Sequence, residues 1–187
     1  VPNLRRRPPV TAVQTPPQRV AWLAGAAVTA LAVDVASKSA AVAWLPGRSV
    51  DLFAGLALRL TRNPGAAFSI GTGITPVFTV VAVAVIAGIS WYGRKVTHRG
   101  WAVALGLIAG GAAGNLVDRL FRSPGLGRGH VVDFLHLDWW PTFNLADSAL
   151  ICGVAVAMWL SLRNVPLSVP AADDSAVSTS AGATGER

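Results

Sequence analysis

WAVALGLIAGGAAGNLVDRL, residues 101–120, has the length of a membrane-spanning helix and a regular spacing of glycine. A bilayer core requires ~20 residues of helix, which this segment supplies. Gly106, Gly110 and Gly114 recur every four residues, so a helix would carry them on one face and could approach a second helix closely there. The segment therefore predicts a transmembrane helix that packs against another helix.

Three other segments are also long and apolar enough to span a bilayer: roughly Val20–Leu45, Ile74–Tyr92 and Phe143–Leu162. The composition agrees, because 52% of the 187 residues are hydrophobic and 13% are charged, with a mean hydropathy of +0.51. These values exclude an ordinary soluble domain and a wholly disordered chain. The first segment is not a removable signal peptide before a soluble domain, because three more apolar segments follow it. We predict an all-α membrane protein with four transmembrane helices.

Tryptophan and basic residues indicate the helix ends and the orientation. All seven Trp fall near predicted helix ends, where their rings favour the headgroup layer. Basic residues are densest in Arg5–Arg7 and in the short second connection, residues 94–99. Since cytoplasmic connections carry an excess of Lys and Arg, we expect both termini inside and the connections 46–73 and 121–142 outside.

Three regions follow from this topology. Residues 1–18 are predicted to be a disordered basic cytoplasmic tail, residues 19–164 a four-helix transmembrane domain, and residues 165–187 a second disordered cytoplasmic tail. The net charge of +7 favours contact with anionic membrane lipid over nucleic acid, because the basic residues lie between apolar runs. A single cysteine, Cys152, excludes an internal disulfide framework and a cysteine-rich metal site.

The first outer connection contains the pattern of a short strand. Leu56, Leu58 and Leu60 occupy every second position, which is the period of a strand with one apolar face. Asn63-Pro64-Gly65 then predicts a turn that reverses the chain. We expect this connection to form a small strand-containing structure on the membrane surface.

Polar residues from all four spans and both outer connections converge on the outer face in this topology. They are Asp34, Lys38, Asn63, Asn115, Asp118, Arg119, Asp133, Asn144 and Asp147. An ionisable group at the centre of a span costs ~2.5–3.5 kcal/mol on insertion scales, so each one needs a reason. A single polar site is the most economical explanation.

Local structural roles are the alternative for several of these residues. Asp34 and Lys38 are spaced i, i+4 and could neutralise each other. Asp118 could pair with a neighbouring arginine, Arg119 or Arg122. Asn144 and Asp147 have the spacing of a helix cap and its capping-box partner.

Carboxylates are the most plausible catalytic groups. The sequence contains no His-Glu-x-x-His helix and no Gly-x-Ser-x-Gly elbow. Two Asp within hydrogen-bond reach would share a proton, so that one activates water and the other protonates a carbonyl oxygen. The residues alone leave Asp118 and Asp133 open as the partner of Asp147, although the Arg beside Asp118 would keep that residue ionised. A small transporter or channel and a purely structural membrane subunit are the rival classes.

Five ordered motifs resemble those of the lipoprotein signal peptidases, the signal peptidase II family. They are Asp34-Val-Ala-Ser-Lys38, Asn63-Pro-Gly-Ala-Ala-Phe68, Gly110-Gly-Ala-Ala-Gly-Asn115-Leu-Val-Asp118-Arg119, Val131-Val-Asp133-Phe134 and Phe143-Asn144-Leu-Ala-Asp147-Ser148. The resemblance covers residues 30–150, and the order of the motifs matches the four-span topology. One departure is the stretch Ser123–Gly129, which lengthens the interval before Asp133.

The resemblance implies a multi-pass aspartyl endopeptidase of the bacterial inner membrane. Such an enzyme removes signal peptides from diacylglyceryl-modified prolipoproteins, cleaving before the lipidated cysteine, without a metal or another cofactor. It implies a catalytic dyad of Asp133 and Asp147 and a strand-containing outer cradle. We expect the protein to be a monomer. The residues expected to bind substrate or support the site are Asp34, Lys38, Asn63, Gly65, Asn115, Asp118, Arg119 and Asn144.

Overall fold

Four long helices form the body of the molecule. A computed structural model describes residues 16–65 and 75–168, and within them lie α1 (Pro16–Trp44), α2 (Thr75–Tyr92), α3 (Arg99–Phe121) and α4 (Leu145–Leu162). A short 3₁₀ helix, η2 (Gly93–Lys95), follows α2. Each long helix is apolar and long enough to cross a membrane, which confirms the prediction of four transmembrane helices.

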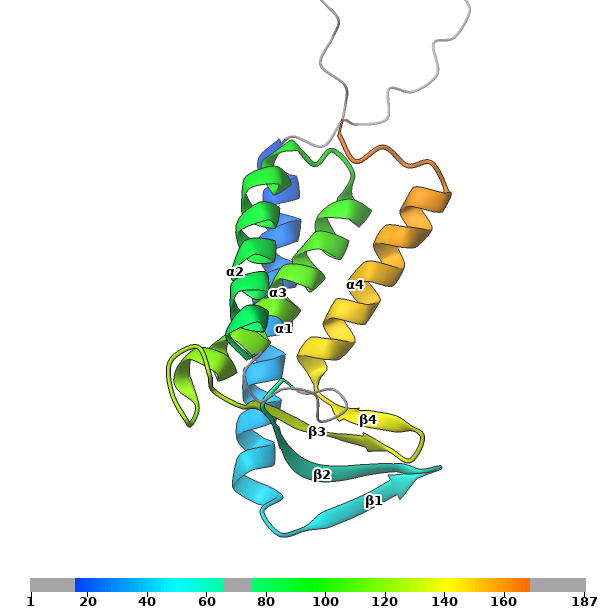
Figure 1. The fold of residues 1–187 in the computed structure, drawn as a ribbon. Coiled ribbons are helices and arrows are strands. Elements are labelled where there is room, and N and C mark those ends of the chain that lie inside the picture. The colour runs from blue at the N-terminus through cyan, green and yellow to red at the C-terminus, as the bar shows by residue number, and fades with distance from the viewer. Residues whose placement is uncertain (1–15, 66–74, 169–187) are drawn as a thin grey trace, which may run out of the picture.

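The first helix differs most from its predicted boundaries. It begins at Pro16 rather than at Val20, because the fixed φ of proline suits the first turn of a helix. Its 29 residues, at a rise of 1.5 Å each, make a helix about 44 Å long. That length exceeds a hydrocarbon core of ~30 Å. The far end of α1 accordingly extends beside the sheet (Figure 1).

A four-stranded antiparallel sheet lies at one end of the helix bundle (Figure 1). Its strands, in the spatial order β1-β2-β3-β4, are β1 (Ser49–Phe53), β2 (Leu56–Asn63), β3 (Val131–Leu137) and β4 (Trp140–Phe143). The strand predicted from Leu56 is present as β2. The second hairpin was not predicted, because Val131–Phe134 is buried throughout and lacks the alternation of a half-exposed strand.

The sheet is attached to the bundle by an apolar cluster at the end of α1. Ala41, Leu45 and Phe134 form its buried centre, and Leu58 and Leu60 of β2 pack against it. The leucine face of β2 therefore contributes to a core between the sheet and α1. This contact fixes the position of β3, which carries Asp133.

Close helix packing runs along the glycines of α3. The Cα of Gly106 faces Leu23 and Ala26 of α1, and that of Gly110 faces Ala27 and Ala30. Each leaves no room for a side chain, as the spacing in the sequence predicted. Gly111 makes a similar contact with α4, so α3 has small residues on two faces and packs against both α1 and α4.

Replacing Gly110 with alanine should destabilise the bundle. A Cβ at Gly110 would lie 2.8 Å from the Ala30 Cβ, so the two helices would have to separate. Overpacking of this kind typically costs ~1–3 kcal/mol. Gly88→Ala in α2 is the matched control, because a Cβ there meets nothing within 4 Å. Thermal unfolding in detergent should show a lower midpoint for Gly110→Ala alone; equal midpoints would contradict the packing.

Candidate active site

The site is built around the first turn of α4, where Asn144 is the N-cap. Its Oδ1 accepts a hydrogen bond from the Asp147 backbone N–H at 3.0 Å. The Asp147 Oδ2 in turn accepts one from the Asn144 backbone N–H at 3.2 Å. The capping box expected from the spacing is thus present, and it fixes the Asp147 side chain at the helix N-terminus.

The Asn144 side chain also donates hydrogen bonds to residues outside α4. The Asn144 Nδ2 donates to Asp133 Oδ1 at 2.6 Å and to Asn115 Oδ1 at 3.2 Å. Asn144 has no exposed surface, so these bonds replace contacts with water completely. One amide side chain therefore connects the helix that carries Asp147 to the strand that carries Asp133.

Asp133 lies on β3 and is 2% exposed. Its second oxygen, Oδ2, accepts a hydrogen bond from Asn63 Nδ2 at 3.0 Å. The orientation of the Asn63 amide is set by its other atom, because Asn63 Oδ1 accepts from the Gly65 N–H at 2.8 Å. Gly65 has a φ of +100°, which suits the turn after β2 and is strained for other residues. The amides of Asn63, at the end of β2, and Asn144, at the start of α4, thus both donate to the Asp133 carboxyl.

The side-chain amide of Asn115, on α3, holds Asp147 in a similar way. Asn115 Nδ2 donates to Asp147 Oδ1 at 2.8 Å. The Asn115 Oδ1 accepts from Lys38 Nζ at 2.9 Å as well as from Asn144. Because both of those groups are donors, the Asn115 amide must direct its own Nδ2 toward Asp147.

A buried ionic cluster lies directly behind these amides. Lys38 Nζ is 2.8 Å from Asp34 Oδ2 and 3.0 Å from Asp118 Oδ2, and Asp118 also pairs with Arg122. The expected local pairs, Asp34 with Lys38 and Asp118 with an arginine, are therefore both present. A buried charge is tolerated only when it is well paired and hydrogen-bonded, as these charges are.

The same carboxylates hold backbone groups from the segments that carry Asp147 and Asp133. Asp34 Oδ1 accepts from the Ala146 N–H at 2.8 Å, in the first turn of α4. Asp118 Oδ2 accepts from the Val132 N–H at 3.0 Å, next to Asp133 on β3. The ionic cluster thus positions both the helix start and the strand. No sequence pattern pointed to Ala146 and Val132 as partners, because they contribute backbone groups.

Burial raises the pKa of Asp133 to about 6. The hydrogen bonds from Asn63 and Asn144 act against this rise, since they stabilise the carboxylate, and the nearby negative charge of Asp147 adds to it. A carboxyl with a pKa near 6 can hold a proton and release it close to neutral pH, which suits general acid or base chemistry.

Arg119 lies outside this hydrogen-bonded network. Its guanidinium carbon is 5.3 Å from the centre of the Phe78 ring, and its Nη1 lies beside Gly65. Within residues 16–65 and 75–168 that nitrogen is buried without a hydrogen-bond acceptor. Phe78 was not expected from the sequence. Residues 66–68 of the second motif lie outside the described residues.

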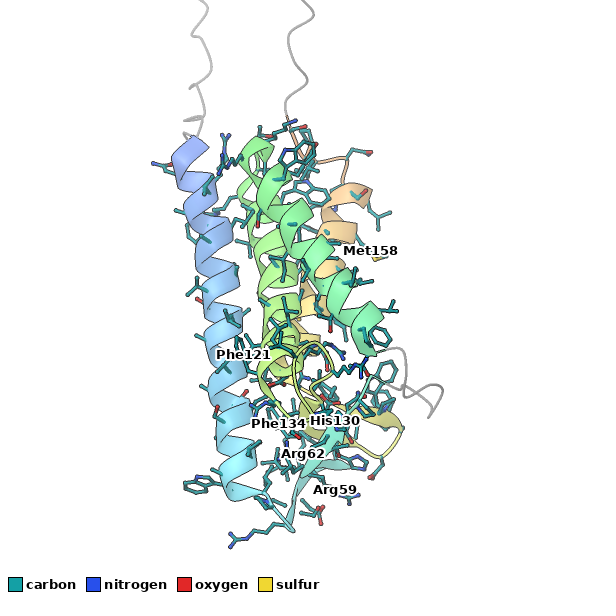
Figure 2. The ribbon with its side chains drawn as sticks, turned by 60° about the vertical axis from the view of Figure 1, so that its left-hand side comes forward. Arg59, Arg62, Phe121, His130, Phe134 and Met158 are labelled. Carbon is teal, nitrogen blue, oxygen red and sulfur yellow. The ribbon has the colours of Figure 1, made fainter. Side chains whose placement is uncertain are left out.

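Eight of the nine polar residues predicted to converge are joined in one network of hydrogen bonds and ion pairs. They are Asp34, Lys38, Asn63, Asn115, Asp118, Asp133, Asn144 and Asp147. Arg62 and Phe134, which are next to Asn63 and Asp133 in the chain, lie at the sheet end of the bundle (Figure 2). In the described part of the chain, no three His, Cys, Asp or Glu side chains are grouped as metal ligands would be. Asp133 and Asp147, in separate environments but tied to one amide, can divide the roles of acid and base.

Comparison with known proteins identifies the family of this chain. The family model described as signal peptidase (SPase) II matches residues 26–163. A lipoprotein signal peptidase of Mycobacterium avium is 49% identical over 149 residues, which are 79% of this chain and 82% of that protein. One from Rhodococcus jostii is 52% identical over 134 residues, 71% of this chain and 68% of that protein.

Two solved structures described as bacterial membrane enzymes have the same fold. The first superposes with a TM-score of 0.66 at 26% identity and covers 78% of this chain and 90% of its own. The second has a TM-score of 0.66 at 27% identity and covers 75% and 92%. The family match spans most of the chain and includes every residue of the network. This chain therefore belongs to the signal peptidase II family of aspartic peptidases.

Proposed function

We propose that the protein removes signal peptides from diacylglyceryl-modified prolipoproteins by cleaving the bond before the lipidated cysteine. The observation that carries the proposal is the pair of carboxyls, Asp133 and Asp147, joined through Asn144 at the end of a membrane bundle. The substrate class is taken from the relatives, which are named lipoprotein signal peptidases.

In the proposed mechanism Asp133 holds the shared proton of the free enzyme, in keeping with its pKa of about 6. Asp147 is the base, because the N-terminus of α4 and the Asn115 amide stabilise its negative charge. Asp147 takes a proton from water as the water oxygen attacks the scissile carbonyl, and Asp133 protonates the carbonyl oxygen. The gem-diol then returns a proton to Asp133 while Asp147 protonates the leaving amine of cysteine.

The remaining residues are proposed to hold this pair and the substrate backbone. Asn63 and Asn144 fix the Asp133 carboxyl, and Lys38 acts on Asp147 through Asn115. Gly65 and Arg119 lie beside the turn after β2, where an extended peptide could be bound. Asp34 and Asp118 position the backbone of the two catalytic segments.

We place the sheet on the outer face of the bacterial plasma membrane and both chain ends inside. Basic residues lie over aromatic rings at the opposite end of the bundle: Arg99 is 5.2 Å from the Trp22 ring centre, Lys95 5.1 Å from Trp91 and Arg163 5.4 Å from Trp159. This enrichment is typical of a cytoplasmic membrane surface. Residues 1–18 and 165–187 would then be cytoplasmic tails, and the protein would act as a monomer in contact with membrane lipid.

Replacing either proposed catalytic carboxyl should abolish cleavage. Asp133→Asn and Asp147→Asn each remove the proton exchange of the pair, so the rate should fall by at least ~10²-fold. Asp138→Asn is the control, because its side chain lies on the same hairpin with 72% of its surface exposed. Turnover of a diacylglyceryl-modified precursor by each purified variant is the measurement. Near-normal turnover by either dyad variant would refute the assignment, as would chelator-sensitive activity restored by a metal.

The pH profile should report the state of Asp133. If protonated Asp133 is the acid, kcat/KM falls as pH rises through about 6. Asn63→Ala removes a donor that stabilises the carboxylate, so the pKa of Asp133 rises and the alkaline limb moves to higher pH. Ser49→Ala, an exposed change on the edge strand β1, should leave the limb in place. A limb that stays fixed or moves to lower pH in Asn63→Ala would contradict this assignment.

Lipid on the substrate should strongly raise the efficiency of cleavage. Two acyl chains would hold the cysteine at the depth of Asp133 and Asp147, with burial contributing ~0.8 kcal/mol per CH₂. We expect a far lower kcat/KM for the same precursor without diacylglycerol, compared at matched surface concentration in one detergent. Equal values would show that the peptide alone determines recognition.

A further inference from the structure

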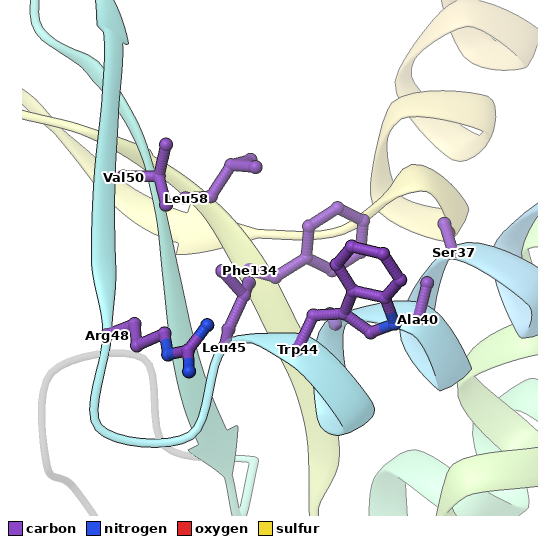
Figure 3. Close-up of a pocket in the computed structure, with 9 residues that line it drawn as sticks. Ser37, Ala40, Trp44, Leu45, Arg48, Val50, Leu58 and Phe134 are labelled. Atoms are coloured by element: carbon purple, nitrogen blue, oxygen red, sulfur yellow. The ribbon is translucent and has the colours of Figure 1, made fainter.

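An apolar groove lies between the sheet end of α1 and the sheet. It has a volume of about 420 Å³, within the ~300–1,000 Å³ range of ligand pockets. Its apolar lining comes from α1 and three strands: Ala40, Ala41, Trp44, Val50, Leu58 and Phe134 (Figure 3). We call this the α1–sheet groove. Its one hydroxyl, Ser37 Oγ, already donates to the Asp34 carbonyl oxygen, so the lining offers little to a polar ligand.

One basic side chain, Arg48, lies at the edge of the groove. Arg48 lies in the turn between α1 and β1, is exposed, and makes no side-chain hydrogen bond or ion pair with any residue in 16–65 or 75–168. A second hollow of about 420 Å³ adjoins the groove and shares Trp44 and Arg48 with it. The apolar α1–sheet groove thus lies next to a second hollow that is lined by Arg48.

The position of the groove fits a lipid boundary. Trp44 is 76% exposed at the end of the helix that extends past the bilayer core, where an indole ring prefers the headgroup layer. With the sheet on the outer face, as proposed above, the groove opens at the level of the outer-leaflet headgroups. An acyl chain could lie against Ala40, Val50 and Phe134 while a phosphate reaches Arg48.

We propose that the α1–sheet groove binds one anionic phospholipid of the outer leaflet. A free anionic phospholipid is favoured over the acyl chains of the substrate because of charge. A diacylglyceryl group carries no phosphate, whereas Arg48, at the edge of the groove, forms no ion pair with any residue in 16–65 or 75–168 and can pair with a phosphate.

Fluorescence quenching by brominated lipid tests this directly. The full chain in a non-ionic detergent is titrated with phosphatidylglycerol or phosphatidylcholine brominated on the acyl chain, and the Trp44 contribution is obtained by subtracting the Trp44→Phe variant. We expect saturable quenching of Trp44, with a half-quenching concentration about five-fold lower for phosphatidylglycerol, as ~1 kcal/mol per basic residue near a membrane surface implies.

Two variants and one control locate the site. Arg48→Gln should remove the preference for phosphatidylglycerol, and Ala40→Phe, which fills the groove from an exposed helix position, should weaken quenching by both lipids. Arg128→Gln, an exposed arginine in the other outer connection, should retain the preference. Equal thermal midpoints would establish that the variants are folded.

Three results would overturn the proposal: equal quenching of the wild type by both lipids, an unchanged preference in Arg48→Gln, or displacement of brominated lipid by a diacylglyceryl precursor as readily as by plain phosphatidylglycerol. The last would assign the groove to the substrate. The assay needs no turnover and can be run in Asp147→Asn, so its outcome is independent of the proposed peptidase activity.

Discussion

The buried ammonium of Lys38 is the contact on which the arrangement of the site depends. It has three partners, Asp34, Asp118 and Asn115, and its side chain is 1% exposed. Each partner holds a different part of the site: Asp34 holds the start of α4, Asp118 holds β3, and Asn115 faces Asp147. Removal of one charge would leave the others buried without compensation, which is far costlier than losing an exposed pair. The cluster therefore joins the start of α4, which carries Asp147, to β3, which carries Asp133.

This ionic cluster requires helices that approach closely. Gly114 of α3 lies against the Asp34 carboxylate and the Ala146 side chain, so any larger residue would displace the carboxylate from Lys38. Gly106 and Gly110 continue the same contact along α1. The polar network therefore depends on the close packing at the α3 glycines. Apolar packing over most of the bundle keeps the charged groups at its end within bonding distance of one another.

The sequence predicted the helices well, because length and apolarity determine a transmembrane span almost independently of the rest of the fold. It also predicted that polar residues from distant segments would converge. It could not show that Asp34 would bind the Ala146 backbone, 112 positions away, or that Asp118 would bind Val132. Such contacts depend on how the helices pack. The β3 strand was missed because both of its faces are buried near Asp133, and alternation is visible only in half-exposed strands.

The N-cap residue of α4, Asn144, contributes both to the helix start and to the environment of Asp133. Serine and aspartate cap helices about as well as asparagine, so capping alone does not require Asn144. Asn144, however, uses its oxygen for the cap and its nitrogen for Asp133. Serine lacks the second donor at that reach, and aspartate would place another negative charge against Asp133. An amide is the side chain that meets both demands, so position 144 serves the carboxyl pair as much as the helix.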